Sequence, residues 1–163
     1  MMNGAEREAF ALNVMKEVRR WPGVQIRPHL NPLAPEDGDD GVEFLLFGRQ
    51  VGHIHPDCSV HVSLTKALKQ MVIEQELAQS LDVAGSAGWA AFQAECTEDA
   101  ARAIWLLRLN YVRLRRQRMS PEAAATSELI QEHERALGEL TPSMSTVLHR
   151  TQARASRPIP PLA

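Results

Sequence analysis

The chain has 163 residues, 44% of them hydrophobic, which fits one domain or one domain with an appendage. The balance of 18 Lys and Arg against 20 Asp and Glu gives no overall field for nucleic acid, and 5% aromatic residues argue against base-stacking surfaces. No apolar run approaches the roughly 18 residues of a membrane helix, and the polar N-terminus does not resemble a signal peptide. Two cysteines without a CxxC spacing indicate no disulfide framework, so we expect a soluble cytoplasmic protein without a membrane partner.

The first third of the chain combines a helical pattern with strand patterns. An amphipathic helix is expected at residues 3–20, because apolar residues recur at helical spacing until Trp21-Pro22-Gly23 ends the pattern. Residues 29–41 predict a solvated acidic loop that lacks the spacing of an EF-hand. Strands are expected at residues 24–28, 42–47, 50–55 and 59–63, of which the last three form an antiparallel meander with a turn at Gly48-Arg49.

Helical patterns dominate the rest of the chain, with one short strand among them. That strand is expected at residues 89–94, after a connection at residues 81–88. Capping residues mark the helix starts, as in Ser120-Pro121-Glu122. The helices are expected at residues 64–79 after Ser63, at 98–117 after Thr97, from Ser120 to about residue 140 and at 143–152, with an extended end at 156–163.

Together these elements predict an α+β fold. It consists of a four-stranded, mainly antiparallel sheet flanked by helices, with a C-terminal helical extension. We place the α+β core at residues 1–118, and the helical extension with its proline-rich tail at residues 119–163.

Charge is unevenly distributed over the second half of the chain. Residues 102–118 contain only basic charges, whereas residues 119–140 are mainly acidic. A basic helix followed by an acidic helix predicts an antiparallel hairpin with opposed charges. The alternative is nucleic-acid contact by the basic helix, with the candidate residues Arg108, Arg113, Arg115, Arg116 and Arg118. Because nucleic-acid binders leave such a face uncompensated, we favour the hairpin.

The stretch from Gly52 to Asp57 is the most suggestive motif for a functional site. Side chains alternate along a strand, so His53 and His55 are expected on one face. Two neighbouring imidazoles are a common start for a Zn or Fe site, and Asp57 and His61 are the candidate further ligands. The candidate residues for a small ligand are His53, His55, Glu43 and Trp89. The alternative is that these histidines only form hydrogen bonds on an open sheet face.

No complete catalytic motif accompanies the histidines. The sequence lacks GxSxG, a P-loop, GxGxxG after a strand and HExxH, so no catalytic residue and no cofactor is assigned. Whether the chain is an enzyme stays open on these observations.

Several short motifs in a fixed order carry a family resemblance. They are Trp21-Pro22-Gly23-Val24, Arg27-Pro28-His29, Gly41-Val42-Glu43-Phe44, Gly48-Arg49-Gln50-Val51-Gly52-His53-Ile54-His55, Gly88-Trp89 and Ile104-Trp105-Leu106-Leu107-Arg108-Leu109-Asn110-Tyr111-Val112-Arg113. In this order the chain resembles the luciferase-domain family of small bacterial and fungal proteins, over about residues 21–114. The element order is also similar to the MmcQ/YjbR-like fold, which implies an antiparallel sheet with flanking helices but no activity.

The leading functional hypothesis from sequence is a non-catalytic binding or interaction module. Its partner would be another protein or a second copy of the chain, bound through the C-terminal extension at residues 119–163. The first alternative is a metal- or small-ligand-binding protein or enzyme centred on His53 and His55. The second alternative is nucleic-acid contact through the basic helix.

Overall fold

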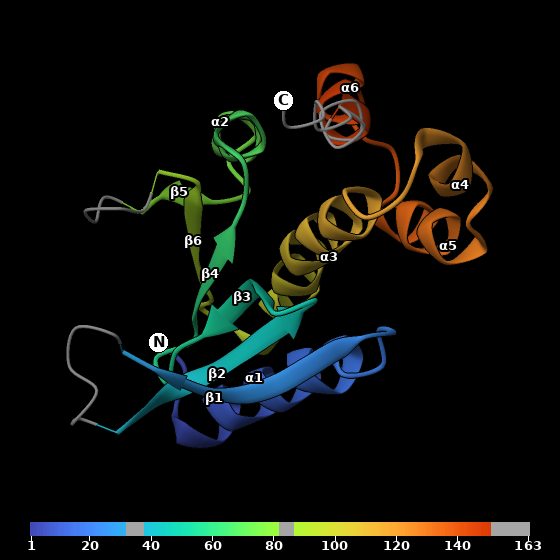
Figure 1. Cartoon of the computed structure of the whole chain (residues 1–163). Coiled ribbons are helices and arrows are strands. Elements are labelled where there is room, and N and C mark those ends of the chain that lie inside the picture. The colour runs from blue at the N-terminus through green and yellow to red at the C-terminus, as the bar shows by residue number, and fades with distance from the viewer. Residues whose placement is uncertain (32–37, 82–86, 151–163) are drawn as a thin grey trace, which may run out of the picture. The chain divides into compact units, whose positions relative to one another are not determined.

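A six-stranded antiparallel sheet organises the first part of the chain, with its strands in the order β1-β2-β3-β4-β6-β5 (Figure 1). The computed structural model describes residues 1–31, 38–81 and 87–150, and the chain divides into two units at Asn110 and Tyr111. The strands are β1 (Val24–Leu30), β2 (Asp39–Leu46), β3 (Arg49–Ile54), β4 (Ser59–Ser63), β5 (Gln79–Ser80) and β6 (Trp89–Gln93).

Along the chain, helices lie before, between and after the strands, as expected for an α+β fold. In the first unit they are α1 (Gly4–Val18), α2 (Lys66–Glu74), the 3₁₀ helix η2 (Thr97–Asp99) and the larger part of α3 (Ala100–Arg116). Helix α1 begins at a capping box, in which Asn3 and Glu6 each satisfy a backbone N–H of the other. The predicted helix at residues 64–79 is shorter than expected and is capped by Thr65 rather than Ser63.

The α+β class is confirmed, but the predicted count of four strands is wrong. The two-residue strand β5 has no pattern of its own and forms only because Gln79 and Ser80 pair with β6. Strand β1 is an edge strand that extends to Leu30, so His29 lies in the sheet rather than in the predicted loop. Parts of the predicted loops (32–37 and 82–86) and the proline-rich end (151–163) lie outside the described residues.

The two faces of the sheet carry different residues, because the pairing register aligns apolar residues on one face and polar residues on the other. One row of cross-strand partners is formed by Phe44, Gly52, Val62 and Ala90, all of which are buried. This face meets α3, since a Cβ atom on Gly52 would lie 2.6 Å from a methyl carbon of Leu107 and 2.6 Å from the backbone oxygen of His61. The neighbouring row, on the opposite face, contains Glu43, His53 and His61.

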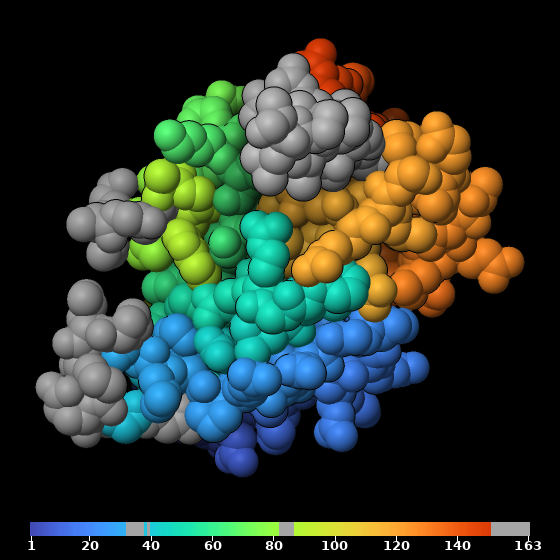
Figure 2. All heavy atoms as spheres, in the orientation of Figure 1, coloured from blue at the N-terminus to red at the C-terminus, as the bar shows by residue number. Residues whose placement is uncertain are grey.

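Helices α1 and α3 are also joined to each other and to the sheet by polar contacts. The buried Asn110 side chain donates a hydrogen bond of 2.7 Å to the backbone oxygen of Val51. Arg108 on α3 forms an ion pair of 2.9 Å with Glu17 on α1, and its guanidinium lies 4.9 Å from the ring centroid of Trp21. The space-filling view shows α1 and β1 (blue) and the atoms of β2 and β3 (cyan) as one continuous surface (Figure 2).

The second unit begins at Tyr111 and is helical throughout its described part. Besides the end of α3 it contains α4 (Pro121–Thr126), α5 (Glu128–Leu137) and α6 (Pro142–Arg150). The predicted cap at Ser120 accepts a hydrogen bond from the Ala123 N–H, but the single helix predicted beyond it is two helices. Ser127 separates them and caps α5. An ion pair joins Arg116 of the basic segment to Glu134 of the acidic segment.

Among the described residues, no helix is both long and apolar enough to cross a membrane. The expected cytoplasmic location stays a prediction.

Candidate metal centre

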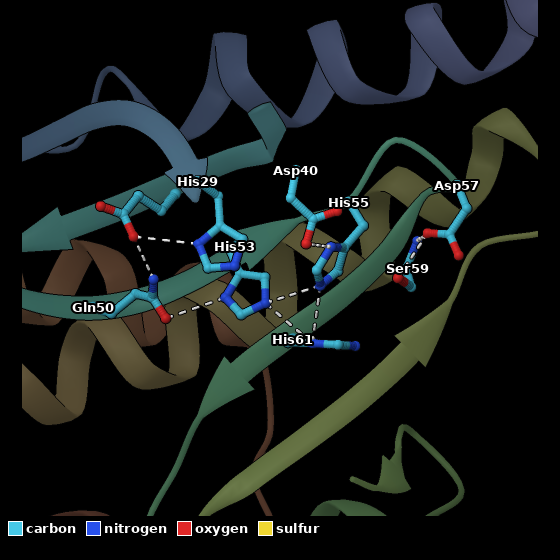
Figure 3. Close-up of polar contacts among 9 residues, drawn as sticks. His29, Asp40, Gln50, His53, His55, Asp57, Ser59 and His61 are labelled. Carbon is cyan, nitrogen blue, oxygen red and sulfur yellow. Dashed lines mark hydrogen bonds and ion pairs between the residues drawn. The ribbon is translucent and has the colours of Figure 1, made fainter. Parts of the chain in front are cut away.

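Three histidines from two neighbouring strands and the turn between them point at one place (Figure 3). His53 on β3 and His61 on β4 are directly opposite each other in the antiparallel register. His55 follows the last residue of β3, where its N–H donates to Ser59 and its carbonyl accepts from Cys58, both at 2.9 Å. The turn thereby holds His55 on the same side as its two partners.

The ring nitrogens of these three residues form a nearly equilateral triangle. His53 Nε2 lies 3.1 Å from His55 Nε2 and 3.0 Å from His61 Nδ1, and the last two atoms are 3.2 Å apart. We call this set, His53, His55 and His61, the histidine triangle. An ion about 2.1 Å from all three nitrogens would have N–ion–N angles of about 95°, within the range of coordination geometries that transition metals accept.

Hydrogen bonds on the far side of two rings define which nitrogen carries the lone pair. Gln50 Oε1 lies 3.1 Å from His53 Nδ1, and Asp40 Oδ2 lies 3.1 Å from His55 Nδ1. An amide or carboxylate oxygen accepts hydrogen bonds, so each Nδ1 is the protonated nitrogen and each Nε2 presents its lone pair to the triangle. Partners of this kind fix the tautomer and the ring orientation of metal-ligating histidines.

The acceptor for His53 is itself held in place. Gln50 Nε2 donates a hydrogen bond of 2.6 Å to Glu43 Oε2 on β2. The amide of Gln50 is therefore oriented with its oxygen toward His53 and its nitrogen toward Glu43. Glu43 was predicted to contact a small ligand. In the structure it lies outside the triangle and contacts Gln50, whose amide oxygen lies beside His53.

Asp40 reaches His55 because of the glycine that follows it. Gly41 has φ of 112°, and a Cβ atom at this position would lie 1.9 Å from the backbone oxygen of Ile54. Only glycine fits such a close approach of β2 to β3 in this conformation. The backbone of β2 is thus shaped so that the Asp40 carboxylate meets the His55 ring.

A fourth histidine, His29 on β1, lies beside the triangle rather than in it. Its ring stacks on His53, with centroids 3.9 Å apart and an interplanar angle of 10°. Its Nδ1 lies 3.4 Å from Glu43 Oε2. One nitrogen each of His29, His53 and His55 fall within 4.8 Å of one another. An ion in the ring plane of His53 would nevertheless lie outside the parallel plane of His29, so we place His29 as a neighbour of the site.

Burial and neighbouring histidines lower the pKa of two members of the triangle, His53 and His61. Burial, together with the neighbouring His29, His61 and His55, lowers the pKa of His53 to about 2. Burial and the nearby His55 lower the pKa of His61 to about 4, although Asp57 and Asp40 oppose this shift. At neutral pH both imidazoles are therefore in the neutral form that binds metals.

A surface hollow of about 460 Å³ opens beside the triangle. Its described lining residues are Asp40, His55, Pro56, Asp57, Ser59 and His61. Asp57, predicted as a ligand, directs Oδ1 to the Ser59 N–H and hydroxyl at 2.9 and 2.7 Å. Burial raises the pKa of Asp57, but these two hydrogen bonds and the nearby His55 and His61 outweigh it and lower the pKa. The ring centroid of Trp89, predicted to contact a small ligand, lies 5.3 Å from that of His53.

The arginines of the alternative nucleic-acid site are engaged within the protein. Arg108 is paired with Glu17, Arg116 is paired with Glu134, and the Arg115 guanidinium lies 5.4 Å from the Tyr111 ring centroid. Arg113 and Arg118 also have interaction partners. These contacts give the nucleic-acid hypothesis no support.

The fold and the histidine triangle define an α+β protein with three imidazoles gathered on one sheet face. The family model described as Luciferase domain matches residues 48–110, so this stretch of the chain is similar to the luciferase-domain family. The match includes His53, His55 and His61 and excludes His29, Asp40 and Glu43. No curated protein and no solved structure matches the chain, so the MmcQ/YjbR-like architecture stays a prediction.

The low pKa values of His53 and His61 predict acid sensitivity of the metal-free protein. In the unfolded chain both groups take up protons near pH 6.5, whereas in the folded chain they do so only near pH 2 and pH 4. Below pH 6.5 the unfolded state therefore binds more protons, and stability falls as the pH is lowered toward 4.

Urea denaturation at pH 7, 6 and 5 in the presence of a chelator measures this effect. The urea midpoint should fall with pH in the native sequence and fall less in His53→Gln. The exposed His149 provides the matched control, since His149→Gln should keep the native slope. Equal slopes in all three proteins would contradict the stated electrostatics.

Proposed function

We propose that this protein binds a divalent transition-metal ion through His53 Nε2, His55 Nε2 and His61 Nδ1. The observation that carries the proposal is the triangle of ring nitrogens, with edges of 3.0 to 3.2 Å. Imidazole ligands favour zinc, copper, iron and nickel over calcium and magnesium, which prefer oxygen ligands.

The hydrogen-bond balance of the triangle supports a cation. With Nδ1 of His53 and His55 protonated, their two Nε2 atoms are both acceptors directed at each other. If His61 Nδ1 is protonated, it can donate a hydrogen bond to one of these Nε2 atoms. The two Nε2 atoms still face each other as acceptors, which is unfavourable. A bound cation satisfies all three lone pairs together.

The surroundings support a site with an open coordination position. Three protein ligands with a free position are typical of catalytic zinc sites, whereas structural zinc sites have four. His55 and His61 line the hollow, so an ion on that side of the triangle would face it. Such an ion can lower the pKa of a bound water molecule or accept a small ligand.

Metal content tests the proposal directly. Untagged protein incubated with Zn²⁺ or Co²⁺ and then passed through a desalting column should retain about one ion per chain, as expected for a three-imidazole site. His53→Ala, His55→Ala and His61→Ala should each retain little or none. His149→Ala, which removes an exposed histidine outside the site, should retain the native amount. Equal metal content in the triangle variants and in His149→Ala would contradict the proposal.

Loss of the hydrogen bond from His53 Nδ1 to Gln50 Oε1 should weaken metal binding without abolishing it. Gln50→Leu removes the acceptor at His53 Nδ1 and should weaken Co²⁺ binding about 10- to 100-fold, the range found for partners of metal-ligating histidines. Gln50→Glu combined with Glu43→Gln keeps an acceptor oxygen at His53 without placing two carboxylates against each other, and it should bind Co²⁺ more tightly than Gln50→Leu. Titration followed by the visible absorption of Co²⁺ measures both. Identical affinity in the two variants would show that this hydrogen bond does not support the site.

The interaction module that the sequence favoured, with its partner bound through residues 119–163, stays a prediction.

A further inference from the structure

The charged side chains that line the hollow beside the histidine triangle are acidic among the described residues. Among the described residues that line it, Asp40 and Asp57 carry carboxylates, and no lysine or arginine is present. Asp57 is exposed and Asp40 has 35% of its side chain exposed, so both can meet a molecule that enters the hollow.

The two carboxylates balance the charge that a bound ion would add. Three neutral imidazoles and a divalent cation have a charge of +2, and Asp40 and Asp57 together contribute −2. The cavity around the ion is then close to neutral. An anion that approached the open coordination position would be attracted by the ion but repelled by two nearby carboxylates.

The hydrogen-bonding groups of the hollow are mostly acceptors. The Ser59 hydroxyl donates its proton to Asp57 Oδ1, at 2.7 Å, and so offers only lone pairs to a visitor. Asp57 Oδ1 is used by Ser59, which leaves Oδ2 as an acceptor. Asp40 Oδ2 accepts from His55 and has a second oxygen. A molecule that binds here must therefore supply N–H or O–H donors of its own.

From this arrangement we infer that the metal-binding hollow selects neutral ligands that carry hydrogen-bond donors and disfavours anions, with Asp57 as the specificity-determining residue. This inference rests on the proposed metal site. Asp57 lies outside the triangle, so its charge can be removed without removing a proposed ligand. The variant Asp57→Asn keeps a side-chain oxygen for the two hydrogen bonds from Ser59 and so preserves the turn.

Three small probes on the Co²⁺-loaded protein test the inference. They are azide, an anion; imidazole, a neutral ligand with an N–H donor; and 1-methylimidazole, which lacks that donor. In Asp57→Asn at low ionic strength, azide should bind about three- to tenfold more tightly than in the native protein, because one nearby negative charge is gone. The gain should shrink when salt is added, since screening weakens the repulsion.

The neutral probes measure the donor requirement. The native protein should prefer imidazole to 1-methylimidazole, and Asp57→Asn should lose most of that preference because its oxygen is already used by Ser59. Glu74→Gln, which removes one exposed charge on α2, is the matched control and should leave all three affinities unchanged.

Failure of the metal site and failure of its selectivity give different results in these experiments. If Co²⁺ is not bound, the proposed metal site is wrong. If Co²⁺ is bound but azide affinity is the same in Asp57→Asn, Glu74→Gln and the native protein, the metal site stands and the inferred selectivity is wrong. A salt-independent gain in azide affinity would also contradict it, because a purely structural change does not respond to screening.

Discussion

The antiparallel register between β3 and β4 is the constraint on which the site depends. It sets His53 directly opposite His61, so that the two side chains leave the sheet on the same face and can meet. Gly52 makes this register possible, because any Cβ there would collide with the His61 backbone and with Leu107. The same glycine lets the apolar face approach α3. The core and the histidine triangle are therefore built on opposite sides of one short strand pair.

Hydrogen bonds to neighbouring side chains orient the imidazoles of the triangle. Gln50 and Asp40 accept from the outer nitrogens of His53 and His55, and Glu43 fixes the amide of Gln50. These groups come from β2 and from the opposite end of β3, so orientation of the rings requires the folded sheet. Burial then lowers the pKa of His53 and His61 and keeps them in the ligating form. Geometry and protonation favour the same function, which is the binding of a cation.

Much of this site could be predicted from strand periodicity alone, and the rest could not. His53 and His55 follow from alternation, and His61 follows from placing the next strand beside them. His29 and Asp40 lie in a segment whose prolines, glycines and acids indicate a loop, although parts of it form strands β1 and β2. Gln50 contacts His53 across a bulge in the pairing of β2 with β3, which no sequence pattern reveals. Strand β5 likewise depends on a tertiary partner and has no local signal.

X-ray absorption spectroscopy of the Co²⁺- or Zn²⁺-loaded protein tests the central claim most directly. It counts imidazole ligands by their multiple scattering and measures the metal–nitrogen distances. Three imidazoles are expected at metal–nitrogen distances of about 2.0–2.1 Å, together with one or more light-atom ligands from solvent. A first shell with no imidazole, or with four imidazoles because His29 has joined, would contradict an open three-histidine centre.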